Sequence, residues 1–264
     1  MAPSKASIWP ADASCDVILG EAVATTPSPT NFIGNSKLST VNSKLSTVFN
    51  FHTYYIIEGE PCLLNVDVAD LLPTYPEGVR LSIGLHPWKV TESWQEAVAL
   101  MREVAKREDV WAIGECGLDK VKYGALPLQM EAFRAQIALA EEVQKPMVIH
   151  CVRAFDELLM LRRELESSCR REGRVAQPWV IHGFRGKPEQ AKQLMTKGML
   201  LSFGHQYNLD TLRVVFTSSR PFFLETDDLR LSVRQIYEQV AHHLGVDVAH
   251  LSRLCDPRQT LFSR

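Results

Sequence analysis

The stretch PMVIHCVRAF, residues 146–155, decides the fold class. In it a proline is followed by a short apolar run that ends at His150. A run this short and this clearly bounded is typical of a fully buried strand in a parallel sheet. The segment PWVIHGF, residues 178–184, repeats the pattern with His182 in the matching position. Parallel α/β folds place their chemistry at the C-terminal ends of such strands, so both histidines are candidate site residues.

Composition sets broad limits on the class of protein. The 264-residue chain has 45% hydrophobic and 23% charged residues, which is ordinary for a soluble protein with a sizeable core. It has no apolar run near the roughly 18 residues of a membrane span and no secretory signal pattern at its start. The six cysteines form no CxxC pair, so we expect reduced thiols and a cytoplasmic protein. With a net charge of −2, a nucleic-acid partner would have to meet a local basic patch.

The first 48 residues differ in texture from the rest. They are rich in Ser, Thr, Pro and Ala, and they contain the heptapeptide NSKLSTV twice, at 35–41 and 42–48. Such a composition favours disorder or a loosely attached arm. We therefore expect a low-complexity N-terminal extension over 1–48 and a folded domain over 49–264.

The folded part alternates between strand-like and helix-like segments. Helical patterns are expected over 92–106, 126–144, 154–167, 187–198, 209–219, 232–244 and 246–262, with a polar connector over 167–177. Apolar strand-like runs begin at 49, 62, 81, 110, 146, 178, 199 and 222. Eight such units in one chain predict an α/β fold of the (β/α)8 TIM barrel type. A doubly wound open sheet is the alternative.

Ionisable residues recur at the predicted C-terminal ends of these strands. In a barrel these ends meet on one face, so we expect the side chains to converge. Imidazole nitrogens together with carboxylate oxygens suit Zn, Mn, Fe or Ni, and Mg where oxygen ligands dominate. Cys116 and Cys151 lie in no recognisable nucleophile turn, and no phosphate-binding loop is present. The six strand-end residues are His52, His86, Glu115, His150, His182 and Asp227.

Five motifs in order carry a family resemblance. They are GLHPW (84–88), GECGLD (114–119), PMVIHCV (146–152), IHGFRG (181–186) and FLETD (223–227). The ordered set resembles the TatD family of metal-dependent hydrolases, which are amidohydrolase-like (β/α)8 barrels, and the resemblance covers roughly residues 49–264. It implies a deoxyribonuclease that hydrolyses DNA or a small phosphodiester with one or two divalent ions, Mg, Mn or Zn. No membrane and no obligate protein partner are implied.

The resemblance also implies roles for individual residues. The first metal would be held by His52, Glu115 and Asp227, and Glu115 would bridge to a second metal on His150 and His182. Asp227 would orient or deprotonate the attacking water, so Asp227 and Glu115 would be the catalytic pair. Two adjacent cations of this kind can clamp the attacking and leaving oxygens of a displacement.

Substrate contacts would come from residues that follow the ligand motifs. His86, Arg153 and Arg185 are the candidates, because each lies at or just beyond a strand end. Residues 153–197 carry ten Lys or Arg against six Asp or Glu, a local net charge of +4 that suits a polyanion.

One motif departs from the family pattern. The first strand of TatD proteins ends in Asp-x-His-x-His, whereas this chain has Asn50, His52 and Tyr54 at those places. A phenol with an ordinary pKa near 10 is a poor ligand at neutral pH unless the metal deprotonates it. Two alternatives therefore stay open. One is a degenerate barrel with an incomplete first metal site and little turnover, and the other is a hydrolase of a small C–N or ester substrate.

The extension gives the first prediction. Deleting residues 1–48 should leave the midpoint of thermal unfolding nearly unchanged, because a segment of this composition contributes little buried apolar surface. Calorimetry on the full-length and truncated proteins checks this. A large drop in midpoint would show that the segment packs on the barrel.

Overall fold

The computed structural model describes residues 48–122 and 124–262. The predicted extension and its tandem heptapeptide lie outside these ranges except for Val48, which is buried. Within them, no helix combines the length and the apolar content needed to cross a bilayer.

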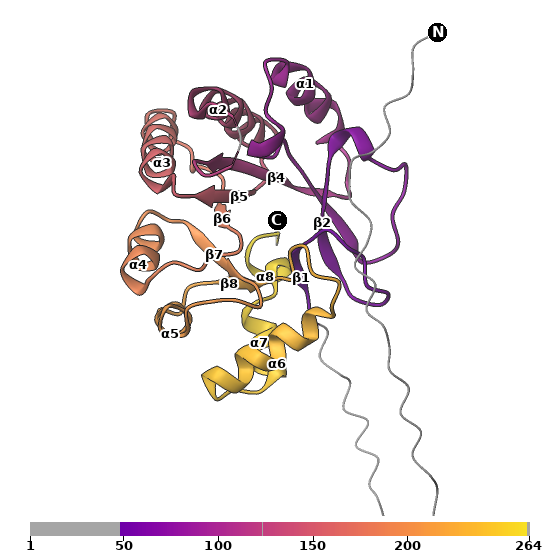
Figure 1. The fold of residues 1–264 in the computed structure, drawn as a ribbon, viewed down its shortest axis with the longest axis vertical. Helices are drawn as coiled ribbons and strands as arrows, with labels where there is room; N and C mark the ends of the chain where they lie inside the picture. Colours follow the sequence, from indigo (N-terminus) through magenta and orange to yellow (C-terminus); the bar gives the residue numbers. More distant parts are fainter. Residues whose placement is uncertain (1–47, 123, 263–264) are drawn as a thin grey trace, which may run out of the picture. The chain divides into compact units, whose positions relative to one another are not determined.

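Eight parallel strands in sequential order form the barrel (Figure 1). Each strand pairs in parallel with the next, and an isolated bridge between Thr53 and Asp227 joins the last strand to the first. The predicted (β/α)8 barrel is therefore confirmed, and the open doubly wound sheet is wrong. The strands are β1 (Asn50–Thr53), β2 (Cys62–Val66), β3 (Val79–Ile83), β4 (Val110–Asp119), β5 (Met147–Val152), β6 (Trp179–Ile181), β7 (Leu200–Phe203) and β8 (Phe222–Leu224).

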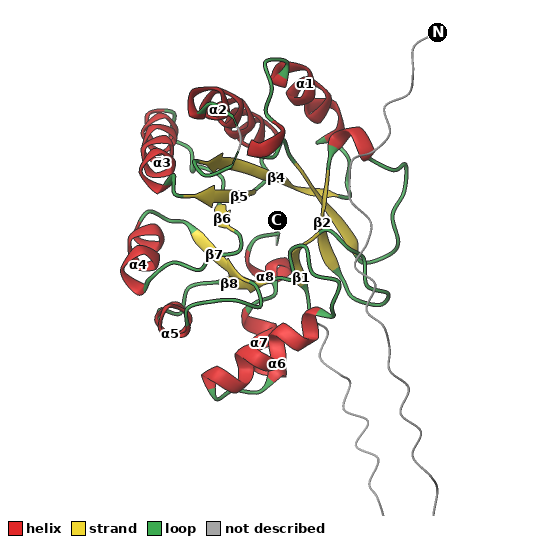
Figure 2. Cartoon of the chain, in the orientation of Figure 1, coloured by secondary structure: helices red, strands yellow, loops and turns green. Residues whose placement is uncertain are grey.

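Helices cover the outside of the strands (Figure 2). Two short 3-10 turns, η1 (Val68–Asp70) and η2 (Pro87–Lys89), follow β2 and β3. The α-helices are α1 (Trp94–Val104), α2 (Leu126–Val143), α3 (Phe155–Arg171), α4 (Pro188–Thr196), α5 (Leu209–Thr217), α6 (Val233–Leu244), α7 (Val248–Leu254) and α8 (Pro257–Thr260).

Two helix predictions need correction. The segment from 167, expected to begin a connector, continues α3 as far as Arg171 before Gly173 turns the chain with φ 70°. The single helix expected over 246–262 is two helices. Pro257 cannot continue α7, and the Asp256 side chain accepts the backbone N–H of Arg258 to start α8.

The barrel interior has its own apolar layer. One side chain from each of six strands fills it, and the rings of Phe51 and Phe223 stack with centroids 4.4 Å apart. Leu261 packs into the same layer, so α8 lies over the middle of the ring of strands (Figure 1). The interior is thus a packed core rather than a pore, as expected for this fold. The six strand residues are Phe51, Leu63, Ala112, Val148, Val180 and Phe223.

Asn50 joins the two ends of the barrel. Its Nδ2 donates to Thr226 Oγ1 at 2.8 Å, and its Oδ1 accepts the Thr226 backbone N–H at 3.1 Å. Both residues are buried, and Asp227 and Tyr54 continue the contact through backbone hydrogen bonds. Asn50, which replaces the aspartate of the family motif, therefore has a structural role: it links β1 to the segment that follows β8.

The hydrogen bonds between Asn50 and Thr226 give a stability prediction. Asn50→Leu, which is similar in volume, should lower the free energy of unfolding by about 1–3 kcal/mol because it leaves the buried Thr226 N–H without an acceptor. Asn50→Asp keeps the acceptor oxygen and should cost less. Urea unfolding followed by circular dichroism measures both. Equal stability of the wild type and Asn50→Leu would contradict this role.

Candidate metal centre

The carboxylate of Glu115 lies at the centre of the strand-end cluster. It is buried, and both of its oxygens face polar side chains from four other strand ends. Oε1 lies 3.0 Å from His86 Nε2, 2.9 Å from His150 Nδ1 and 2.9 Å from His182 Nε2, while Oε2 lies 3.3 Å from His52 Nε2 and 2.5 Å from the Tyr54 hydroxyl.

An irregularity in β4 sets the position of Glu115. The register of β4 against β5 shifts between Ile113 and Cys116, and the Glu115 N–H donates to Asn65 Oδ1 at 2.7 Å instead of joining the ladder. Gly117, at φ 139°, allows β4 to approach β5, since a Cβ there would lie 2.1 Å from the carbonyl oxygen of His150. Bulges that redirect a side chain are frequent beside active sites.

Asp227 and His52 form the second part of the cluster. His52 Nε2 lies 3.5 Å from Asp227 Oδ1, and the backbone N–H of Asp227 donates to the His52 carbonyl at 3.0 Å. The Asp227 side chain is 34% exposed, whereas that of His52 is fully buried. Of these two side chains, only that of Asp227 reaches solvent.

Two acidic residues that the sequence analysis did not select orient two of the imidazoles. Asp119 Oδ2 lies 3.1 Å from His150 Nε2, and Glu225 Oε1 lies 3.3 Å from His182 Nδ1. Carboxylates commonly fix metal-ligating histidines in this way. The signal was available: Asp119 is four residues after Glu115, and Glu225 is two before Asp227, spacings that put strand residues on one face.

His86, expected to contact substrate, is a direct neighbour of Glu115. Its Nδ1 accepts the backbone N–H of Trp88 at 3.1 Å, so in the neutral ring Nε2 carries the proton and donates to Glu115. Burial lowers the pKa of His86, which favours this neutral form despite the opposing influence of Glu115. The neutral His86 ring is therefore a hydrogen-bond donor to the Glu115 carboxylate.

Tyr54 stands where the family has its second histidine, and its phenol donates to Glu115. Burial and the adjacent Glu115 charge both raise the pKa of Tyr54, so the hydroxyl is neutral at physiological pH. The side chain therefore supplies a hydrogen bond to the cluster, whereas a histidine would supply a nitrogen lone pair.

The charges within the cluster depend on one another. Burial alone would raise the pKa of Glu115, but His182, His150 and His52 together hold it well below its usual range. Burial and the nearby His182 oppose the charged form of His52, yet its contacts with Asp227 and Glu115 outweigh them and raise its pKa to about 9. Without a metal, protons on imidazoles therefore balance the buried carboxylate.

The donor atoms fit divalent cations. Two groups, His52 with His182 and Asp227, and His86 with Glu115 and His150, each place three donor atoms within 4.8 Å of one another. His52 Nδ1 is buried without a hydrogen-bond partner, as is Glu225 Oε2. Buried polar atoms are normally satisfied, so these orphaned atoms are consistent with a cation that would complete their coordination.

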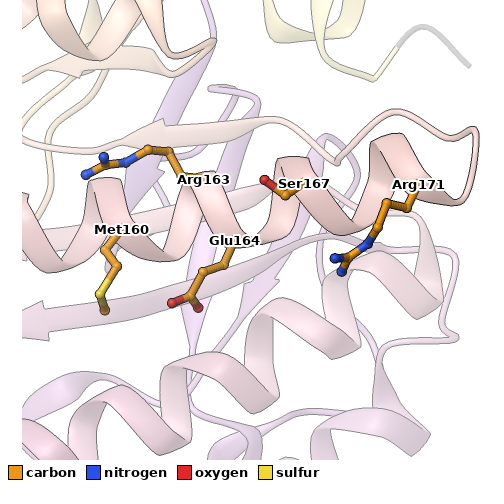
Figure 3. Close-up of a pocket in the computed structure, with 5 residues that line it drawn as sticks. All are labelled: Met160, Arg163, Glu164, Ser167 and Arg171. Atoms are coloured by element: carbon orange, nitrogen blue, oxygen red, sulfur yellow. The ribbon is translucent and has the colours of Figure 1, made fainter.

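Among the described residues, neither predicted arginine forms a hydrogen bond or ion pair with this cluster. Arg153 is exposed at φ 53°, and Arg185 donates to Gln206. Their contact with substrate stays a prediction. Not every basic residue counted over 153–197 is available to a polyanion, because Arg162 is buried against Trp179 and paired with Glu166. A surface pocket beside two further arginines is lined only by α3, at Met160, Arg163, Glu164, Ser167 and Arg171 (Figure 3).

Comparisons with known proteins agree with this architecture. In the curated relatives, the chain is 37% identical over 128 residues to the uncharacterized metal-dependent hydrolase YabD of Bacillus subtilis, covering 48% of this chain and 47% of that protein. It is 30% identical over 155 residues to the 3'-5' ssDNA/RNA exonuclease TatD of Pantoea ananatis, covering 56% and 54%. The alignments thus span about half the length of these relatives.

Solved structures support the fold. The TatD homologue YjjV of Escherichia coli superposes with a TM-score of 0.64 at 17% identity, covering 83% of this chain and 98% of that one. A TatD-family hydrolase from Entamoeba histolytica gives 0.60 at 13% identity, covering 83% and 99%. The family model for TatD-related DNases matches residues 45–255, which is most of the chain. The chain therefore belongs to the TatD family.

Proposed function

We propose that this protein is a divalent-metal-dependent hydrolase that cleaves phosphodiester bonds in DNA. The observation that carries the proposal is the convergence of Glu115, Asp227 and the imidazoles of His52, His150 and His182 on one buried cluster. The names of the relatives, a metal-dependent hydrolase and an exonuclease, support the same class of reaction. Mg, Mn and Zn are the candidate ions, and the many imidazoles favour Mn or Zn.

The chain's own residues divide the remaining tasks. A bound divalent ion would supply Lewis-acid stabilisation of the phosphate and lower the pKa of water. Glu115 is enclosed on both oxygens, so it holds ligands in place and does not exchange protons with solvent. Asp227 meets solvent, and its contact with His52 lowers its pKa although burial opposes this. It is therefore ionised at neutral pH and is the residue suited to accept a proton from an attacking water.

Tyr54 supports a second candidate function, a degenerate barrel that holds metal with little turnover. The group around His52 has a neutral phenol beside it where the family has an imidazole. The phenol occupies Glu115 Oε2, whereas Oε1 of the same carboxylate faces His86 and His150. We therefore propose that one ion binds tightly and a second binds weakly, and that turnover is correspondingly slow.

One experiment tests the function. Protein purified with Mn, Zn or Mg is analysed for metal content and assayed on single-stranded DNA, on a small phosphodiester and on a small ester or amide. We expect phosphodiester cleavage that His150→Ala abolishes, because a lost ligand cannot be replaced, while the exposed control His250→Ala retains it. Cleavage of only the ester or amide, or metal binding without any turnover, would overturn the proposal.

The replaced ligand gives a further prediction. Tyr54→His should raise metal stoichiometry and phosphodiesterase activity together, since both depend on the same coordination. Tyr54→Phe is the matched control, because it removes the hydrogen bond to Glu115 and adds no ligand. Elemental analysis and initial rates measure the two quantities. If the wild type already holds two ions and Tyr54→His changes neither quantity, the weak-site proposal is wrong.

The charge on His52 predicts the direction of the pH dependence. Its pKa of about 9 means that the metal-free protein carries a proton there at pH 7, which a cation must displace. Although burial opposes it, contacts with Glu115 and Glu225 also raise the pKa of His182, so binding should release protons from both rings. Affinity should rise at least about tenfold per pH unit below the pKa of His52. Calorimetric titration in buffers of different ionisation enthalpy measures the release. His52→Gln should make the dependence less steep, and a flat profile in the wild type would contradict this account.

A further inference from the structure

Trp88 is a large aromatic side chain that is exposed yet held in place. The residue is 41% exposed, its Nε1 donates to Asp119 Oδ2 at 2.7 Å, and its backbone N–H donates to His86 Nδ1. It lies in η2, directly after the strand-end His86. The bond from Nε1 restrains the indole, and the bond from the backbone N–H restrains the main chain that carries it. The exposed side chain therefore has little conformational freedom left to lose on binding.

This surface borders the ligand cluster. The Trp88 ring centroid lies 4.7 Å from that of His86 and 5.7 Å from that of His150. The carboxylate that accepts the indole N–H is also the one beside His150 Nε2. A phosphodiester bound at the cluster would therefore bring an adjacent nucleotide close to this ring.

A cation already lies over the ring. Lys122 Nζ is 3.9 Å from the Trp88 centroid, within the range of a cation–π contact. Within the described ranges no carboxylate pairs with Lys122, whereas Lys120 binds Glu157 at 2.7 Å. A flexible lysine without an acidic partner can move aside to meet a phosphate when another group takes the ring.

The other cation–π pairs among the described residues differ from this one. Their rings, those of Phe49, Tyr55, Trp111 and Trp179, are buried or half-buried and serve packing. Trp88 is the exposed member of the set, and it is the one beside the ligand cluster. An aromatic face with a free cation is the combination by which proteins hold unpaired bases and their phosphates.

We propose that Trp88 and Lys122 form a stacking platform for an unpaired base next to the scissile phosphate, and that these two residues give this chain its selectivity for unpaired bases. This inference rests on the proposed function and deepens it. Bases in a duplex already stack on one another, so their faces are not available to an aromatic side chain. Removal of one base–aromatic contact typically weakens binding by roughly tenfold.

The test measures binding, so that it does not depend on turnover. Fluorescence anisotropy of the full-length, Mn-loaded protein gives the Kd for a labelled single strand, for the same strand with abasic residues and for the duplex. The wild type should prefer the base-containing strand by roughly tenfold over the abasic one and also over the duplex. Trp88→Leu should bring the ratio of base-containing to abasic Kd near one. Trp88→Phe, which keeps a ring but loses the N–H, should retain most of the preference.

Lys122→Gln is expected to act differently. It should weaken both strands alike and reduce the salt dependence of binding, since phosphates are present with or without bases. An unchanged preference in Trp88→Leu would overturn the platform. An equal loss in Trp88→Leu and Trp88→Phe would also overturn it, because the indole would then act only by orienting Asp119.

Failures of the two proposals can be told apart. Base-dependent binding that needs Trp88, without cleavage of any phosphodiester, would leave the platform standing and overturn the proposed function. Cleavage of the strand without any preference for bases would do the reverse. Equal affinity for duplex and single strand would overturn the platform.

Discussion

A buried carboxylate is the constraint on which the site depends. An ionised Glu115 in the barrel interior is unfavourable unless several donors surround it. Four other strand ends meet this need, with Tyr54 and four imidazoles facing its oxygens. The positions of the four histidine rings in space thus depend on one acceptor, the Glu115 carboxylate. Additional carboxylates, Asp119 and Glu225, then orient the outer nitrogens of two rings.

The sequence predicted the barrel because the signals it needs are local. Each strand is a short apolar run with clear bounds, and all eight lie where they were expected within a few residues. The position of a histidine at the end of such a run was enough to predict that His52, His86, His150 and His182 share one face, since the topology of the barrel brings strand ends together.

The remaining features depend on contacts between distant segments. The sequence marked Asn50 as a lost aspartate, and only the fold reveals its hydrogen bonds to Thr226 across the barrel seam. The hydrogen bond between His86 and Glu115 is another such contact, because periodicity does not show which partner a ring nitrogen will find, and the contact of His86 with substrate stays a prediction. The charge count of 153–197 included Arg162, whose guanidinium packs on the Trp179 ring. Helix ends also shifted, because the balance between a cap and a continuing turn is small.

The seam and the interior layer have a consequence for folding. Asn50 and Thr226 are 176 positions apart, and Leu261 seals a layer that begins with Phe51. Contacts this distant in sequence make closure slow, because a long stretch of chain loses entropy before the contact forms. The interior layer is complete only when the segment around Leu261 is available to pack into it. A chain that lacks this segment leaves apolar surface of the layer unpaired, and such surface favours aggregation.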